Sequence, residues 1–158
     1  MKNKDSFTLI EILVAIFILS LIIICATSIL YLGDLNWRRD SILLELQQKA
    51  RIAMDRMSRE LRQAQGSSIT ISNEGKNISF SIPDLLGGTY DINYYLDINS
   101  NQIIREYPAG TTQILGNNIS SLNFSLSGDT LTITLQASKS LRGNPLSLSL
   151  KEKIKLRN

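Results

Sequence analysis

The chain has 158 residues, of which 43% are hydrophobic and 20% are charged, and its formal net charge is +3. It contains no histidine and one cysteine, Cys25, which excludes an intramolecular disulfide and every catalytic group that depends on histidine. The small net charge does not by itself indicate a nucleic-acid-binding protein. The length suits one domain of ordinary size with an additional segment.

The first predicted element is an apolar segment behind a short charged leader. Between Ile12 and Leu32 the polar side chains are Ser20, Thr27, Ser28 and Tyr31. About 20 such residues in a helix cross the hydrocarbon core of a bilayer, so we predict a membrane-spanning helix. Lys2 and Lys4 before it favour a cytoplasmic N-terminus.

Two other readings of this segment are disfavoured. A buried core helix would need a larger domain around it, because the segment is apolar on every side. A cleaved secretory signal has an apolar region of about 7–15 residues and an Ala-x-Ala-like cleavage site. Here the apolar run is longer and no such site follows it.

A second helical stretch is predicted from Asp34 to Gln65. Its apolar residues recur every three or four positions, which is the stripe of an amphipathic helix: Leu43, Leu46, Ala50, Ala53, Met57, Leu61 and Ala64. Gly66 supplies a stop signal. No proline lies between Phe7 and Gln65, so both stretches are expected to form one continuous helix.

From Ser67 onward the hydrophobic period changes to two, which indicates half-buried strands. Apolar residues alternate with polar ones around positions 69–71, 78–82, 92–96, 122–126, 131–135 and 146–150. Turn residues separate these runs at 73–75, 99–101, 127–129 and 143–145. We predict an antiparallel meander with one apolar face covered by the helical stripe, and long loops at 84–89 and 108–118.

The region after the helix offers few candidates for chemistry. Asp84 and Asp97 are isolated acids, interpreted as turn and surface residues. Lys151, Lys153 and Lys155 alternate, so they would share one face of the last strand. Lysines there commonly prevent aggregation of an edge strand, and contact with DNA or another anion is the alternative.

Glu11 is a carboxylate at the start of the apolar segment. A charge in a membrane costs about 2.5–3.5 kcal/mol at the bilayer centre and less near the interface, so a partner is expected. If the chain were cut between Ser6 and Phe7, the new α-amine would begin the apolar helix. That amine could pair with Glu11 of a neighbouring subunit or with Glu11 of its own chain.

The segment Ser6–Glu11, SFTLIE, resembles the prepilin processing motif of type IV pilins and type II secretion pseudopilins. Other stretches are similar to W-type minor pilins and J-type minor pseudopilins: residues 53–64, 94–97, 104–106 and 156–158. The family nearly always has glycine where Ser6 stands.

The resemblance implies a maturation and assembly route. A prepilin peptidase would cleave between Ser6 and Phe7 on the cytoplasmic side and N-methylate Phe7. Glu11 would support recruitment by pairing with a neighbour's amine. An inner-membrane assembly platform would move the subunit from the lipid of the inner (cytoplasmic) membrane into a periplasmic or cell-surface filament of pilins or pseudopilins. Minor members sit at or near the tip and help to initiate assembly.

We therefore predict an α+β, pilin-like fold with four parts: a leader peptide (1–6), a transmembrane and filament-core helix (7–32), an amphipathic helix (33–66) and an antiparallel β head (67–158). The expected function is that of a minor pilin or pseudopilin in a type IV pilus, a type II secretion system or a DNA-uptake system. We expect a structural subunit rather than an enzyme, with no cofactor or metal. The alternative is a membrane-anchored extracytoplasmic binding module that is not polymerised.

Overall fold

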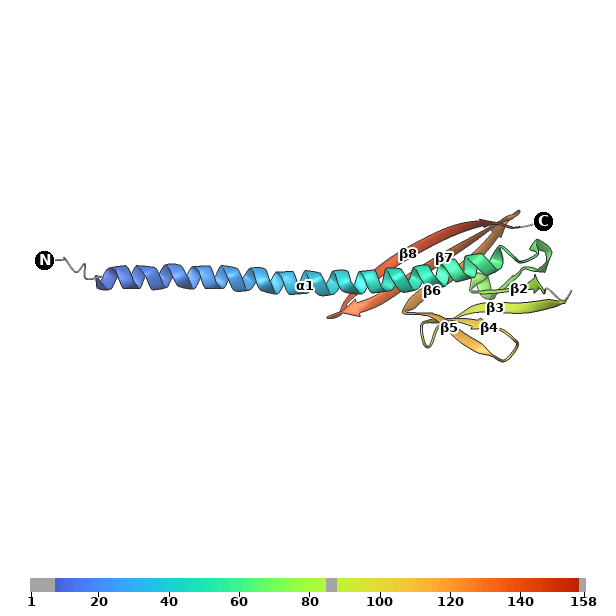
Figure 1. Cartoon of the computed structure of the whole chain (residues 1–158), viewed down its shortest axis with the longest axis horizontal. Coiled ribbons are helices and arrows are strands. Elements are labelled where there is room, and N and C mark those ends of the chain that lie inside the picture. Colours follow the sequence, from blue (N-terminus) through green and yellow to red (C-terminus); the bar gives the residue numbers. More distant parts are fainter. Residues whose placement is uncertain (1–7, 85–87, 157–158) are drawn as a thin grey trace. The chain divides into compact units, whose positions relative to one another are not determined.

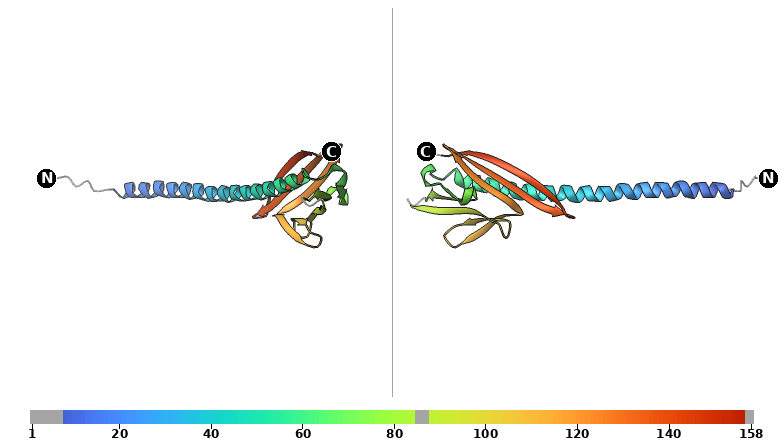
Figure 2. Two further views of the ribbon diagram at one scale, coloured as in Figure 1. Left: turned by 45° about the vertical axis from the view of Figure 1, so that its right-hand side comes forward. Right: turned by 180° about the vertical axis from the view of Figure 1, so that it is seen from behind.

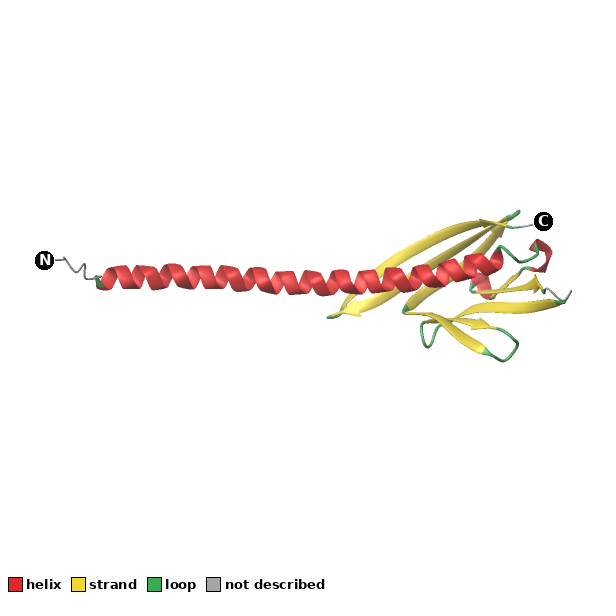
Figure 3. Ribbon diagram, viewed as in Figure 1, coloured by secondary structure: helices red, strands yellow, loops and turns green. Residues whose placement is uncertain are grey.

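The computed structural model describes residues 8–84 and 88–156 (Figure 1). The chain forms two compact units, Met1–Asp40 and Ser41–Asn158. Helix α1 (Leu9–Leu61) supplies the described part of the first unit and the start of the second, and eight strands follow it (Figure 3). The predicted α+β architecture, a long N-terminal helix followed by antiparallel strands, is confirmed.

Helix α1 ends at Leu61, earlier than the predicted Gln65. The backbone first tightens, since Gln63 N–H donates to Glu60 O at 3.0 Å and Ala64 N–H donates to Leu61 O at 3.3 Å. Gln65 is then extended (φ −75°, ψ 130°) and precedes the short 3-10 helix η1 (Gly66–Ser68). The apolar period continues to Ala64 because this residue still faces the core, although it lies beyond the helix.

The first five strands form one antiparallel sheet in the order β1-β2-β3-β4-β5. Their bounds are Thr70–Ser72, Asn77–Pro83, Thr89–Asp97, Gln102–Glu106 and Thr112–Asn117. The short 3-10 helix η2 (Asn73–Gly75) joins β1 to β2. The predicted loop over 108–118 is wrong for residues 112–117, which form the edge strand β5.

The last three strands form a second sheet in the order β6-β7-β8 (Figure 2). They are Ile119–Ser127, Thr130–Leu141 and Asn144–Lys155. Within each sheet the strands follow one another in chain order, as in the predicted antiparallel meander, but they are divided between two sheets instead of forming one. Asn118, with a positive φ of 61°, separates β5 from β6. The Ile119 N–H donates to Asn101 O at 2.9 Å, and Asn118 O accepts the Ser138 N–H at 2.8 Å, so the chain passes from one sheet to the other.

One hydrophobic core joins both sheets to the second part of α1. It includes residues from the helix, from the five-stranded sheet and from the three-stranded sheet, among them Leu46, Ala53, Met57, Phe80, Ile103, Phe124 and Ile133. At Gly116 of β5 an added Cβ would stand 3.5 Å from Ala53 Cβ, which reflects the close approach of strand and helix. The predicted covering of the sheet by the helical stripe is thus confirmed.

A glycine is needed where η2 meets β6. Gly75 has a φ of +89°, and an added Cβ would lie 2.7 Å from Asn123 Nδ2 and 2.8 Å from the Phe124 carbonyl oxygen. Both the backbone conformation and the close backbone neighbour exclude a larger residue. The tight turn therefore places the first hairpin against the three-stranded sheet.

Candidate assembly site

The start of α1 is a capping box formed by Thr8 and Glu11. Thr8 precedes the first helical residue, and Glu11 is the third residue of the helix. The N–H and the hydroxyl of Thr8 donate to Glu11 Oε2 at 2.8 and 3.0 Å, and the Glu11 N–H donates to Thr8 Oγ1 at 3.4 Å. These bonds satisfy N–H groups that have no partner inside the helix, and the carboxylate lies at the positive end of the helix dipole.

The capping box uses one of the two carboxylate oxygens of Glu11. Within residues 8–84 and 88–156, no ion pair involves Glu11 and no hydrogen bond reaches its Oε1. Glu11 lines a shallow depression on one side of the helix with Ile10, Val14, Ala15 and Ile18. The small residue Ala15 in this depression is of the kind that lets another helix approach closely.

The apolar part of α1 has the properties of a membrane-spanning segment. It is long and apolar enough to cross a bilayer. Its large apolar side chains between Leu9 and Leu32 are 48% to 80% exposed, so no other described part of the chain covers them. The hydroxyls of Ser20, Thr27 and Ser28 donate to carbonyls three or four residues earlier in the helix, which satisfies them without water.

A charged cluster attaches α1 to the five-stranded sheet. Glu60 Oε2 accepts hydrogen bonds from the Tyr94 hydroxyl at 2.5 Å and from Arg105 Nε at 3.0 Å. Arg56, one turn earlier in the helix, lies 3.5 Å from the other carboxylate oxygen. Burial, together with the hydrogen bond to Glu60, raises the pKa of Tyr94. The ring of Tyr107 stacks under the Arg105 guanidinium at 5.1 Å.

A second set of ion pairs attaches α1 to the three-stranded sheet. Glu45 accepts from Lys49, one turn later in the helix, at 2.7 Å and from Lys139 of β7 at 3.0 Å. Arg62, just after the helix, donates to Glu152 of β8 at 3.2 Å. The two lysines lower the pKa of Glu45 from 4.5 to about 2, by hydrogen bonding first and by charge second. Both sheets are thus joined to the helix by polar contacts as well as by the core.

The structure places the predicted site residues as follows. Ser6 and Phe7 lie outside the described residues, so the predicted cleavage site stays a prediction. Glu11 lies at the helix start, and its partner Thr8 was missed, although Thr-x-x-Glu is a recognisable capping-box pattern. Asp97 is the last residue of β3, at a strand end, and its carboxylate accepts from the Ser100 hydroxyl and the Asn99 N–H of the turn that follows. These hydrogen bonds, that of Ser100 first, lower the pKa of Asp97.

The polar cluster around Glu60 was also missed. The chain separates Glu60 from Arg105 by 45 residues, so no local pattern relates them. In the described part of the chain, no group of three or more His, Cys, Asp or Glu residues could hold a metal ion. The alternating Lys151, Lys153 and Lys155 are exposed, whereas Ile154 between them is buried, which confirms their predicted common face.

Comparison with known protein families relates the start of the chain to one of them. Residues 1–24 match the family model described as the prokaryotic N-terminal methylation motif. Neither the search of curated proteins nor the search of solved structures gave a match. The matched residues include the predicted cleavage site, Glu11 and the first turns of the apolar part of α1.

Proposed function

Because the chain carries the prokaryotic N-terminal methylation motif, the signature of type IV pilins and pseudopilins, we propose that it is a minor pilin or pseudopilin. In this proposal it is a structural subunit that is assembled with other pilins or pseudopilins and has no catalytic role of its own. The observation that carries the proposal is the position of the motif, directly on the start of an exposed apolar helix that leads into an α+β head.

The proposed maturation creates a cation where the apolar helix begins. A prepilin peptidase cleaves between Ser6 and Phe7 and methylates the new amine of Phe7. An amine and a carboxylate at the edge of a bilayer are both costly to leave unpaired. Glu11 is the acid nearest to this amine in the apolar segment, so the pair compensates both charges.

Pairing with a neighbouring subunit is supported by the geometry at Glu11. Thr8 already occupies Oε2 from the same chain. Oε1 has no partner within the described residues, and Glu11 lines the shallow depression on the side of the helix together with Ala15. A neighbouring helix that packs here with an axial offset brings its own amine to this oxygen, so both charges are compensated when subunits assemble.

The remaining parts of the proposal concern the setting. Before assembly the subunit spans the inner membrane with its N-terminus in the cytoplasm. An assembly platform then moves it into a filament, at or near the tip. Lys2 and Lys4 before the helix support this orientation. The filament is a type IV pilus, a type II secretion pseudopilus or a DNA-uptake pseudopilus, and the head contacts neighbouring subunits.

Two substitutions of Glu11 test the assembly role. Glu11→Ala removes both the cap and the charge, whereas Glu11→Gln keeps a side chain able to complete the capping box. We expect both variants to remain in the membrane and to be lost from sheared filaments or from complexes cross-linked to other pilins, by about tenfold or more if the pair contributes at least 1.4 kcal/mol. Normal recovery of Glu11→Gln would contradict charge pairing and leave helix capping as the role of this residue.

A further inference from the structure

Charge is divided unequally between the two sheets of the head. Residues 70–117, which contain the five-stranded sheet, include five acidic and two basic residues: Glu74, Asp84, Asp91, Asp97, Glu106, Lys76 and Arg105. Residues 119–156, which contain the three-stranded sheet, include five basic and two acidic residues: Lys139, Arg142, Lys151, Lys153, Lys155, Asp129 and Glu152. The nearly neutral chain therefore carries two regions of opposite charge.

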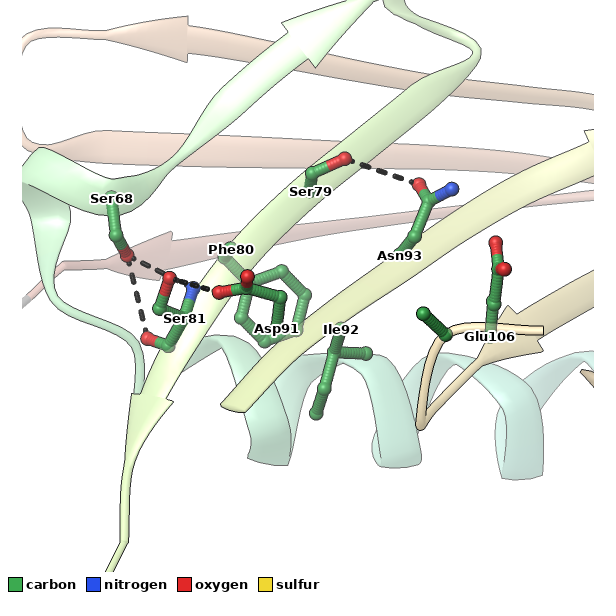
Figure 4. Close-up of a pocket in the computed structure, with 9 residues that line it drawn as sticks. Ser68, Ser79, Phe80, Ser81, Asp91, Ile92, Asn93 and Glu106 are labelled. Carbon is green, nitrogen blue, oxygen red and sulfur yellow. Dashed lines mark hydrogen bonds between the residues drawn. The ribbon is translucent and has the colours of Figure 1, made fainter. Parts of the chain in front are cut away.

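The acidic region presents a polar face in which Asp91 is exposed and the other residues are half-buried. Asp91 and Asn93 of β3 and Glu106 of β4 lie on the side of the sheet opposite to the buried Ile92, and Ser79 and Ser81 of β2 lie beside them (Figure 4). Together with Ser68 and Ala109, these residues line a pocket. We call the surface formed by Ser79, Ser81, Asp91, Asn93 and Glu106 the acidic face.

The carboxylates of the acidic face are held in place by neutral donors. The Ser81 hydroxyl donates to Asp91 Oδ1 at 2.6 Å, and the Gly110 N–H donates to Glu106 Oε1 at 2.9 Å. In the described residues neither carboxylate forms an ion pair, because Arg105, the basic residue of β4, points to the other side and binds Glu60. The acidic face therefore has two oriented negative charges that the head does not neutralise.

The basic region presents a face of opposite charge along the edge strand β8. Lys151, Lys153 and Lys155 are exposed, and their neighbours across the sheet are the neutral Thr134, Thr132 and Thr130. On the other side of these threonines, their partners in β6 are also neutral: Asn123, Ser125 and Ser127. Among the described residues no ion pair involves the three lysines, which we call the basic face.

The spacings of the two faces agree. Alternate residues of a strand are about 6.8 Å apart, which is the distance between successive lysines. Asp91 lies two residues from Asn93, the partner of Glu106 in the next strand. A strand spacing of about 4.8 Å then puts Asp91 and Glu106 roughly 8 Å apart. Two neighbouring lysines can therefore reach the two carboxylates at the same time.

From these observations we propose that the acidic face of one copy of the chain docks against the basic face of a second copy. Charge complementarity selects this occupant, because the two faces match each other in sign, spacing and lack of partners. The contact joins different surfaces of the two copies, so it can add subunits in one direction without closing into a ring. DNA is a poorer partner for the basic face, since the acidic face of the same head would repel phosphates.

The test uses the full chain, with Cys25 and the leader intact, purified in detergent without any assembly machinery, so its result is independent of processing at Ser6. A carbodiimide joins carboxylates to lysines that are in contact. We expect a cross-linked dimer in which mass spectrometry identifies a bond between Asp91 or Glu106 and a lysine of the basic face. Raising the salt concentration should reduce its yield.

Charge reversal provides the decisive comparison. Glu106→Lys alone and Lys153→Glu alone should each weaken self-association about tenfold, the size of effect expected when like charges face one another. An equal mixture of the two variants should restore the dimer, because each retains one unchanged face that fits the other variant. Asp55→Lys, which makes the same charge change at an exposed residue of α1, should leave self-association unchanged.

Three results would overturn the proposal. The first is a dimer that the two reversals and their mixture leave unchanged. The second is a failure of the mixture to restore association although each variant retains the circular dichroism of the original chain. The third is binding of a short DNA duplex that is lost in Lys153→Glu while the original chain shows no self-association, which would assign the basic face to nucleic acid.

Discussion

At the scale of single residues, the two carboxylate oxygens of Glu11 differ in their surroundings. Its Oε2 completes the capping box with Thr8, and its Oε1 has no partner within the described residues. The cap explains how the chain tolerates an acid at the start of an apolar helix, since the helix terminus stabilises negative charge. The proposed pairing with an amine therefore adds an interaction and does not require the existing one to break.

Ser6 carries the prediction that belongs to the cleavage site itself. Ser6→Gly should be processed at least as completely as the original chain, because glycine is the smaller residue and the one that the resembling family nearly always has at this position. The ratio of precursor to mature chain, measured by mass spectrometry in cells with an active prepilin peptidase, checks this. Slower processing of Ser6→Gly would show that the cleaved bond lies elsewhere.

At the scale of elements, α1 is joined to each sheet through a few partly buried polar contacts. Tyr94 and Arg105 of the five-stranded sheet both bind Glu60. The side chains of Arg105 and Glu60 are 12% and 18% exposed. If one hydrogen-bonding partner in this cluster is removed, the group that loses its hydrogen bond therefore has little access to water. These contacts are expected to determine the position of the helix on the sheet in addition to the apolar core.

Tyr94→Phe should lower the free energy of unfolding of the head by about 1–2 kcal/mol, because it removes a hydrogen bond to a partly buried carboxylate. Urea unfolding of the full chain in detergent, followed by circular dichroism, measures this loss. Tyr95→Phe, in the next position but on the opposite face of the sheet, is the matched control and should change stability by less than about 0.5 kcal/mol. Equal effects of the two substitutions would contradict a stabilising role for the Glu60 cluster.

Glu45 makes the stability of the head depend on acid pH. Lys49 and Lys139 lower its pKa in the folded state from 4.5 to about 2. The stability that the ionised Glu45 contributes is therefore complete above about pH 4.5, where the carboxyl is ionised in both the folded and the unfolded state. This stability is lost as the pH falls toward 2. Melting temperatures of Glu45→Gln and the original chain should differ at pH 6 and converge near pH 2. A constant difference across this range would contradict the pKa shift.

The sequence predicted most elements of the head, but not their division into two sheets. Regular alternation located β2, β3, β6, β7 and β8, whose inner residues are apolar. Strand β4 breaks this rule, because Arg105 points inward to Glu60 while Ile104 is partly exposed. Strand β5 has an exposed Ile114, a glycine against the helix and a register shift against β4. The alternation of apolar and polar residues that identifies a strand is therefore broken in β4 by the inward-pointing Arg105 and in β5 by the exposed Ile114 and the buried glycine.

The candidate site also has parts that the sequence predicted and parts that it did not. Glu11 and the apolar segment are recognisable because their pattern is local, and the family model matches the same region, residues 1–24. The Glu60 cluster and the acidic face depend on residues from different strands, so their assembly becomes visible only in the folded head. Local chemistry could be predicted from the sequence, whereas chemistry that depends on strand pairing could not.

At the scale of the whole molecule, the chain consists of two units, and each of the two proposals concerns one of them. The first unit has an uncovered apolar helix, and the second has a closed core with charged faces. The two proposals are separable for this reason. Assembly through Glu11 requires a processed N-terminus, whereas docking of the acidic face on the basic face requires the folded head.

The mass of the N-terminus tests the central proposal most directly. The full chain is expressed in cells with an active prepilin peptidase, and its N-terminal peptide is analysed by mass spectrometry. We expect a chain that begins at Phe7 and carries one additional methyl group on its α-amine. A chain that retains Met1 and the leader in those cells would contradict the proposal that it is a pilin or pseudopilin, and would favour a membrane-anchored module that is not polymerised.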